Sequence, residues 1–323
     1  MINRTEQDIM KNWQGDATVS VVSICTITYN HEAFVAEALD SFLMQETDFP
    51  FEIVIDDDCS TDNNAKVIQP YIDKYPNIFN ANLRSVNVGM QENGEGNLKR
   101  AKGKYIALCE GDDYWTDPLK LQKQVDFLEG NEGYSMVFHN AELHDYFTDG
   151  TMKKSLFNEL VTSCDYSADM ILDRHSVATA SVVFRNLKQY KYLEKNFWFP
   201  VGDTPLFITC AAHGKVYYMV EVMSVYRRVL GGMMKSAAFQ NIKTNPLWIR
   251  YYKQLYADYS YLIAKKTIDK HLSIIYQNAG IEKKIEKKHF TYMKYLWLAF
   301  KSDPYYIINI YFDSLLNKFK KEK

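Results

Sequence analysis

The sequence lacks the glycine-rich loops that hold phosphates in two large classes of α/β protein. No GxGxxG stretch follows the first predicted strand, and GxxxxGK[ST] occurs nowhere in the 323 residues. Residues 19–40 contain no glycine at all. These absences exclude the usual dinucleotide-binding and P-loop sites, so a phosphate-bearing ligand would have to be held by side chains and a metal ion.

Cysteines and long apolar runs are also scarce. The five cysteines form no CxxC pair, and we interpret them as small buried side chains of a protein in a reducing compartment. No run of about 18 apolar residues occurs, which predicts no membrane-spanning helix. The first 16 residues lack the apolar segment of a signal peptide. We therefore expect a cytoplasmic protein.

The charges are unevenly distributed along a chain of ordinary globular composition. Hydrophobic residues make up 47% and charged residues 24% of the sequence, as in a soluble domain with a real core. Residues 243–323 carry 16 Lys and Arg against 7 Asp and Glu, whereas the remainder carries 22 against 33. An acidic body followed by a basic tail indicates two different roles, and the acidic body argues against a nucleic-acid partner.

Short apolar runs alternate with helical patterns over the first 130 residues. Strands are predicted at residues 19–27, 51–55, 78–84 and 104–109, each followed by an amphipathic helix. Ser60 or Asp62 is the expected N-cap of the second helix, and Asp117 that of the fourth. Four alternations favour a parallel sheet with right-handed crossovers.

Polar residues follow three of these strands. They are Thr28-Tyr29-Asn30 after the first, DDDCSTD at residues 56–62 after the second, and Glu110-Gly111-Asp112-Asp113 after the fourth. The carboxyl ends of parallel strands share one edge of a sheet, where ligands bind in open α/β folds. Because neighbouring carboxylates repel one another, a hard divalent ion such as Mg²⁺ or Mn²⁺ would stabilise them. The alternative is a polar loop with a capping aspartate.

A calcium-binding loop does not explain the second run. With Asp56 at position 1, Thr61 stands where an EF-hand needs glycine, and Val67 where it needs glutamate.

In their order and spacing these segments resemble the nucleotide-sugar-binding half of glycosyltransferase family 2, which has the GT-A fold. The matching stretches are SICTITYNHE, EIVIDDDCSTD, GKYIALCEGDDYWTDP and, later, VGDTPLF. The resemblance is dense over residues 19–130. It implies an α/β, Rossmann-like and mostly parallel sheet flanked by helices, with a C-terminal helical region. The expected organisation is a lead at residues 1–18, the nucleotide-sugar half at 19–130, the acceptor-binding half at 131–240 and a basic, aromatic helical region at 241–323.

The resemblance also implies roles for the residues after the first two strands. Thr28, Tyr29 and Asn30 would line the pocket of the nucleotide. Asp57 or Asp58 would accept a hydrogen bond from the imide of the base. Arg84 either touches the nucleotide or lies at the surface.

Glu110-Gly111-Asp112 occupies the position of the family's DxD motif. Asp112 would bind the metal that bridges the diphosphate, with Glu110 near the ribose or a metal-bound water. Asp113 is a further ligand or a contact to the donor sugar. Two departures are Glu110 in place of the first aspartate and Ile27 in place of the proline before Thr28; neither changes the chemistry expected of the motif.

Asp203 matches the aspartate that acts as the family's general base, which removes the proton of the attacking hydroxyl. The alternative is an N-cap ahead of Pro205, and both can hold. Arg227 and Arg228 fall in a stretch resembling VYR-x-H-x-G, with Val229 at the histidine position. Either arginine could neutralise the diphosphate, and this loop is expected to close over the donor. His139 faces the acceptor or is a structural histidine.

These implications predict an inverting glycosyltransferase that depends on a divalent metal. The donor would be a nucleotide-diphosphate sugar, most simply a UDP-sugar of hexosyl or N-acetylhexosaminyl type. The acceptor would be a saccharide or lipid-linked saccharide of bacterial surface polysaccharide synthesis. The alternatives are a sugar-phosphate nucleotidyltransferase and a non-catalytic nucleotide-sugar-binding protein. Basic, aromatic helices in residues 283–323 favour peripheral contact with the inner face of the cell membrane, or packing against the catalytic domain.

Overall fold

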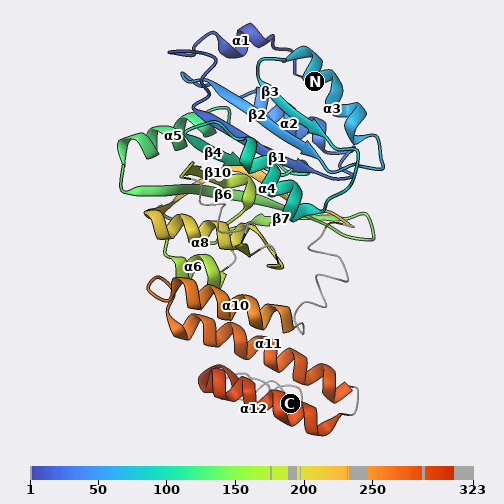
Figure 1. Cartoon of the computed structure of the whole chain (residues 1–323), viewed down its shortest axis with the longest axis vertical. Helices are drawn as coiled ribbons and strands as arrows, with labels where there is room; N and C mark the ends of the chain where they lie inside the picture. Colours follow the sequence, from blue (N-terminus) through green and yellow to red (C-terminus); the bar gives the residue numbers. More distant parts are fainter. Residues whose placement is uncertain are drawn as a thin grey trace. The chain divides into compact units, whose positions relative to one another are not determined.

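The computed structural model describes residues 2–174, 177–187, 195–196, 198–230, 232, 246–285 and 288–308. The chain divides into two compact units, Met1–Ser167 with Arg174–Leu230 and Ala168–Asp173 with Gly231–Lys323 (Figure 1). Gly231 of the loop predicted to close over the donor, and residues 309–323 of the basic tail, lie outside the described residues.

The first unit is built on one mixed sheet with the strand order β3-β2-β1-β4-β9-β6-β10-β5, to which β7 adds beside β6 and β8 beside β10. The strands are β1 Val22–Thr28, β2 Phe51–Asp57, β3 Phe79–Leu83, β4 Tyr105–Leu108, β5 Tyr114–Trp115, β6 Tyr134–Tyr146, β7 Met152–Leu156, β8 Cys164–Asp165, β9 Val183–Arg185 and β10 Lys215–Arg228. The first four strands pair in parallel, as the alternation of strands and helices predicts.

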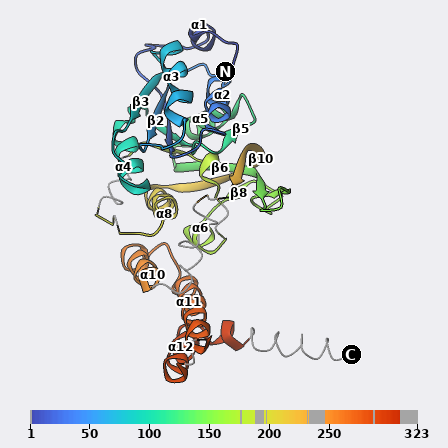
Figure 2. The ribbon, with the colours of Figure 1, turned by 90° about the vertical axis from the view of Figure 1, so that its right-hand side faces the viewer.

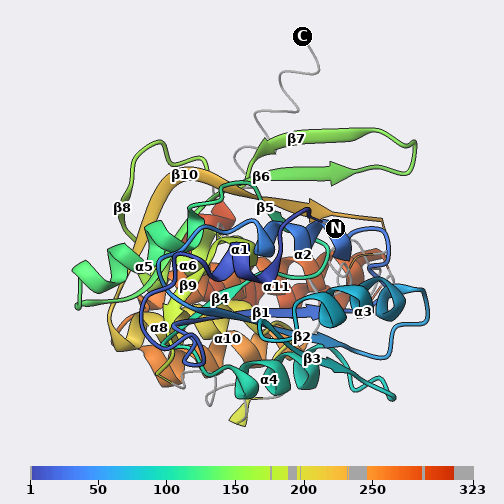
Figure 3. The ribbon, with the colours of Figure 1, turned by 90° about the horizontal axis from the view of Figure 1, so that it is seen from above.

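Helices flank both faces of the sheet. They are α1 Glu6–Met10, α2 Val35–Leu43, α3 Asn64–Lys74, α4 Met90–Arg100, α5 Lys120–Gly130 and α8 Asp203–His213. Helix α2 buries Val35, Ala38, Leu39 and Phe42, one apolar stripe at helical spacing. Helices α2 and α4 lie on opposite sides of β1 and β2 (Figure 3). Because both faces are covered, β1 and β2 are almost continuously buried.

Two predicted helix caps are wrong by a few residues. Helix α3 has Asn63 as its N-cap and α5 has Leu119. Ser60 instead donates its hydroxyl to Asp57, so its oxygen is used within the loop. The carboxylates of Asp62 and Asp117 still accept bonds from nearby backbone N–H groups, those of Asn64 and Leu119. The cap chemistry is therefore present, but it acts just before the first helical turn.

A lysine lies fully inside the first unit. The Nζ of Lys120 donates to Gln124 Oε1 at 2.7 Å and lies 4.1 Å from the centre of the Trp115 ring. Among the described residues, no carboxylate accepts a hydrogen bond from it. Burial therefore lowers the pKa of Lys120 from 10.5 to about 7.

The second unit is helical. Helix α11 (Lys265–Ile285) packs between α10 (Pro246–Tyr259) and α12 (His289–Ser302), as Figure 2 shows. Asp169 of α6 (Ala168–Arg174) accepts hydrogen bonds from Ala264 N and Thr267 Oγ1 at the start of α11. Within the described residues, none of the helices is long and apolar enough to span a bilayer.

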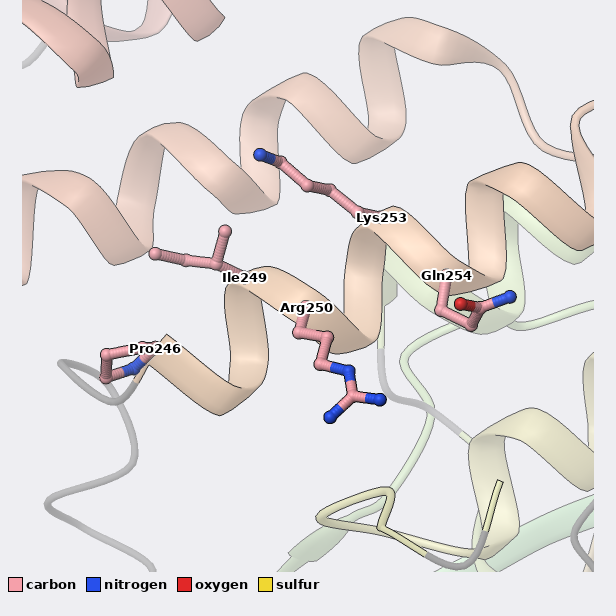
Figure 4. Close-up of a pocket in the computed structure, with 5 residues that line it drawn as sticks. All are labelled: Pro246, Ile249, Arg250, Lys253 and Gln254. Atoms are coloured by element: carbon pink, nitrogen blue, oxygen red, sulfur yellow. The ribbon is translucent and has the colours of Figure 1, made fainter. Parts of the chain in front are cut away.

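A cavity of about 380 Å³ lies along α10, lined by Pro246, Ile249, Arg250, Lys253 and Gln254 (Figure 4). All five lining residues come from this one helix, and no carboxylate, thiol or hydroxyl side chain is among them. We assign no chemistry to it.

The buried lysine predicts a measurable pH dependence of stability. Between pH 7 and 10.5 the unfolded chain holds a proton on Lys120 that the folded chain has lost, so the free energy of unfolding rises with pH over this window. Replacing Lys120 by methionine should remove a slope of about 1.4 kcal/mol per pH unit. Urea unfolding at several pH values between 7.5 and 9.5 measures it. Lys123→Met, at an exposed position of the same helix, is the control; equal slopes in wild type and Lys120→Met would contradict the assignment.

Candidate functional site

The loops after β1, β2 and β4 are in contact at one edge of the sheet. Asn64 Nδ2 donates to Asp57 Oδ1 at 2.7 Å and to Thr28 Oγ1 at 3.1 Å, joining the first two loops. Gly111 N donates to Ile27 O at 3.0 Å. A Cβ at Gly111 would lie 2.6 Å from Thr28 Oγ1, so only glycine allows the third loop to come this close. Three of the predicted site segments therefore converge.

Asp57 and Asp58 use their carboxylates to shape these loops. Asp57 accepts hydrogen bonds from the backbone and hydroxyl of Ser60. Asp58 accepts from Val88 N at 2.8 Å and Gly89 N at 2.9 Å, just before α4. Both aspartates are buried. Asp57 Oδ1 accepts from both Ser60 and Asn64, whereas Asp57 Oδ2 and each oxygen of Asp58 accept one bond and keep a second lone pair for a ligand.

The residues after Thr28 form a second link between the same loops. Asn30 and Cys59 both adopt left-handed backbone conformations, with φ of 56° and 59°. Asn30 donates its N–H to Ser60 Oγ at 2.8 Å and accepts from Thr61 N at 2.8 Å. Asn30 thus holds the loops together, whereas the Tyr29 side chain is 44% exposed and offers a ring face at the surface.

Four carboxylates gather beside this junction. Burial, then Asp112 and Asp203, raise the pKa of Glu110 to about 8. Burial, Asp112 and Glu110 raise the pKa of Asp113 well above its usual range. The structure therefore brings Asp203 within electrostatic reach of the Glu110–Asp113 loop. Half-buried Tyr226 on β10 has its pKa raised first by desolvation and then by all four acids, so it lies among them.

Arg227 contacts the loop of Glu110–Asp113, the acid loop, through both its backbone and its side chain. Its backbone N–H donates to Asp113 Oδ1 at 2.7 Å and its Nη1 to Asp112 O at 2.8 Å. The guanidinium lies 4.4 Å from the Tyr114 ring centre and 5.2 Å from that of Phe34. It also pairs with Glu37 of α2. Arg227 thus joins β10, α2 and the acid loop.

Other predicted site residues lie apart from the acids. Arg228 Nη2 pairs with Asp145 Oδ2 at 3.0 Å on the neighbouring strand β6. Arg84 Nε donates to Asn93 Oδ1 at 2.7 Å, and its Nη2 lies 3.7 Å from buried Asp56.

Two further predictions concern single residues. The N-cap alternative for Asp203 is wrong, because the N-cap of α8 is Gly202 and Asp203 is the first residue of the helix. Its carboxylate accepts a hydrogen bond from Thr204 N at 2.6 Å. His139 is buried, with Nδ1 2.7 Å from Asn140 O, and burial lowers its pKa well below the usual range. A neutral, buried His139 fits the interpretation that it is a structural histidine.

Sequence reasoning missed His31, Asn64 and Tyr226. His31 Nε2 lies 3.8 Å from Asp112 Oδ2, and its Nδ1 is buried with no partner among the described residues. Its place directly after Thr28-Tyr29-Asn30 was a usable signal. The sequence around Asn64 and Tyr226 gives no such signal, because their contacts form only when segments far apart in the chain meet.

The acid loop fits a divalent cation shared with a ligand. Asp113 Oδ2 is buried without a partner in the described part of the chain. Across those residues no group of three His, Cys, Asp or Glu side chains could hold a metal by itself. Mg²⁺ commonly takes one or two carboxylates and completes its coordination with substrate phosphates and water. A group of carboxylate oxygens that includes those of Asp112 suits that arrangement.

Comparison with known proteins places this sheet and its loops in a family. The model of glycosyl transferase family 2 matches residues 23–200, more than half of the chain. The chain therefore belongs to glycosyl transferase family 2. The crystal structure of residues 1–349 of Staphylococcus aureus TarS in complex with UDP-GlcNAc superposes with a TM-score of 0.54 at 17% identity, covering 85% of this chain and 90% of that fragment. That likeness confirms the predicted GT-A fold.

Curated relatives agree with the family. An uncharacterized protein of Mycobacterium tuberculosis is 41% identical over 216 residues, 67% of this chain. The putative teichuronic acid biosynthesis glycosyltransferase TuaG of Bacillus subtilis is 30% identical over 144 residues, 43% of this chain. The alignments span only 61% of the Mycobacterium protein and 54% of TuaG.

The bonds of Asp58 predict a structural cost when it is truncated. Asp58→Ala leaves the N–H groups of Val88 and Gly89 without their acceptor, so we expect the free energy of unfolding to fall by about 2 kcal/mol. Asp58→Asn keeps one oxygen and should cost less. Chemical unfolding of both variants measures this, with Asp149→Asn in an exposed turn as control. An unchanged stability of Asp58→Ala would show that the two bonds contribute nothing.

Proposed function

We propose that the protein is an inverting, metal-dependent glycosyltransferase that takes its sugar from a nucleotide-diphosphate sugar, in the first instance a UDP-sugar. The sugar, of hexosyl or N-acetylhexosaminyl type, goes to a hydroxyl of a saccharide or lipid-linked saccharide in the synthesis of bacterial surface polysaccharide. The observation that carries the proposal is the meeting of Glu110, Asp112 and Asp113 with Asp203, which comes from a distant part of the chain. Membership of the family supports it, as do the UDP-GlcNAc complex of TarS and the teichuronic acid role suggested for TuaG.

In this proposal residues 19–130 form the donor half and residues 131–240 the acceptor half. The exposed ring of Tyr29 stacks on the base, while Thr28 and Asn30 shape the loop that surrounds it. Asp57 accepts the imide N–H of the base through the second lone pair of its Oδ2. Arg84 reaches the nucleotide only by leaving Asn93 and Asp56, so we place it at the margin.

Asp112 would hold the divalent cation, with Glu110 and Asp113 beside it. When bound, the cation stabilises the charge that develops on the departing diphosphate. Asp203 lies across from these acids at the start of α8 and accepts the proton of the acceptor hydroxyl as that oxygen attacks the anomeric carbon. The hydroxyl oxygen bonds to the anomeric carbon while the bond to the diphosphate oxygen breaks. A single displacement of this kind inverts the anomeric configuration.

Arg227 acts, in this account, by positioning the acid loop. Its guanidinium holds Asp112 through the backbone carbonyl and its own backbone N–H holds the Asp113 carboxylate. Binding the diphosphate directly would compete with these contacts. Arg228 could bind the diphosphate only by giving up its ion pair with Asp145.

A sugar-phosphate nucleotidyltransferase remains the second candidate, because it would also need acids at this edge of a sheet. It would require a glycine-rich, lysine-containing phosphate loop early in the chain, and residues 19–40 have no glycine. Formation of a nucleotide sugar from a nucleoside triphosphate and a sugar 1-phosphate would favour it. Nucleotide binding without turnover on any acceptor would favour a non-catalytic protein.

Two isosteric substitutions test the proposed roles. With Mn²⁺ and a panel of nucleotide sugars, Asp203→Asn should lower turnover by about a hundred- to ten-thousand-fold, the usual cost of losing a general base. Its binding of the nucleotide should persist. Asp112→Asn should lose the Mn²⁺-dependent part of nucleotide binding, measured by calorimetry.

Asp126→Asn, at an exposed site on α5, is the matched control and should behave as wild type. If Asp203→Asn and Asp112→Asn turn over a donor at the wild-type rate, the assignment of both residues is wrong.

Removing the Arg227 side chain should weaken the metal site without abolishing the fold. Arg227→Gln loses the bond to Asp112 O, so we expect the Mn²⁺ concentration for half-maximal activity to rise about 10- to 100-fold, as for other residues that orient a metal ligand. The KM for the donor at saturating Mn²⁺ should change less. Lys123→Gln is the charge-matched control. A large rise in donor KM at saturating Mn²⁺ would instead indicate direct diphosphate binding.

A further inference from the structure

Helix α12 exposes large apolar side chains in a regular row. Phe290, Met293, Trp297 and Phe300 recur every three or four residues and therefore share one face. Phe290 is 89% and Trp297 59% exposed. We call these four residues the α12 stripe. A helix on a globular protein usually turns such a row towards the core, so its exposure needs an explanation.

The α12 stripe is not the packing face of the helix. The opposite side of α12 already packs on α11, where Ala299 is fully buried and its carbonyl accepts from Ser273 Oγ at 3.0 Å. A Cβ at Gly280 of α11 would lie 3.3 Å from that of Tyr295, so the two helices approach closely there. Because α12 has used one face for folding, the stripe is free to contact something outside this pair of helices.

The charges on the same face identify the kind of partner. Lys294 and Lys301 are exposed next to the stripe, and Lys301 Nζ lies 5.1 Å from the Trp297 ring centre. Helix α12 contains no aspartate or glutamate. A second copy docking stripe to stripe would bring lysines towards lysines without a counter-charge on this helix. An anionic lipid surface satisfies both the apolar row and the lysines.

We propose that the α12 stripe rests on an anionic membrane surface. The aromatic side chains enter the boundary between headgroups and acyl chains, a position that suits tryptophan in particular. Lys294 and Lys301 remain at the level of the lipid phosphates, with their aliphatic stems along the apolar row. The contact is peripheral, in keeping with the hydropathy of the described helices. It depends on neither the donor nor the acceptor of the transfer reaction.

Vesicle co-sedimentation of the full chain tests the proposal. Wild type should bind vesicles of equal parts phosphatidylcholine and phosphatidylglycerol and bind pure phosphatidylcholine much more weakly. Lys294→Gln with Lys301→Gln should weaken binding to the anionic vesicles by about fivefold per lysine. Phe290→Ser with Trp297→Ser should reduce binding at high salt as well, because the apolar contact is not screened.

Matched controls remove the same groups elsewhere. Lys11→Gln with Lys153→Gln deletes two exposed lysines of the first unit, and Val161→Ser deletes an exposed apolar side chain there. Both should bind vesicles as wild type does, and thermal unfolding should show that all variants are folded. Equal binding of the stripe variants and wild type would overturn the proposal. The proposal would also be overturned if the wild type did not bind vesicles but formed a dimer in sedimentation equilibrium, and if the stripe substitutions dissociated that dimer.

Discussion

The carboxylates at one edge of the sheet repel one another, and the arrangement of the rest of the site depends on holding them together. Glu110, Asp112 and Asp113 come within four positions of one loop, and Asp203 joins them from α8. Desolvation, followed by the neighbouring carboxylates, raises the pKa values of two of them, Glu110 and Asp113. Such a cluster persists only because surrounding elements hold it in place.

Several parts of the fold stabilise that cluster. Arg227 at the end of β10 bonds to the acid loop through both its backbone and its side chain, and it is fixed in turn by Glu37 and by two aromatic rings. On the other side, the Gly111 N–H ties the loop to Ile27 at the end of β1, and Asn64 joins the end of β1 to that of β2. The acids are therefore held by bonds from several neighbouring elements, the kind of support that a precisely arranged site requires.

The second unit differs from the first in where its large apolar side chains lie. In the first unit, apolar rows such as that of α2 are buried against the sheet. In α12 the buried side is made of small and tyrosine residues against α11, while phenylalanine, methionine and tryptophan face outward with lysines. The basic, aromatic composition of the tail predicted an amphipathic surface, but not which face the folding of the helices would leave exposed.

Local patterns in the sequence determined the four parallel strands, their alternation with helices and the acidic chemistry at their ends. They could do so because burial, turn formation and charge are encoded by neighbouring residues. Tertiary structure alone decided that Asp203 and Tyr226 lie among the acids, that Arg227 binds the loop, and that Asp58 caps the backbone before α4. Those contacts join segments far apart in the chain, and they depend on how β6, β9 and β10 pair, which no local pattern specifies.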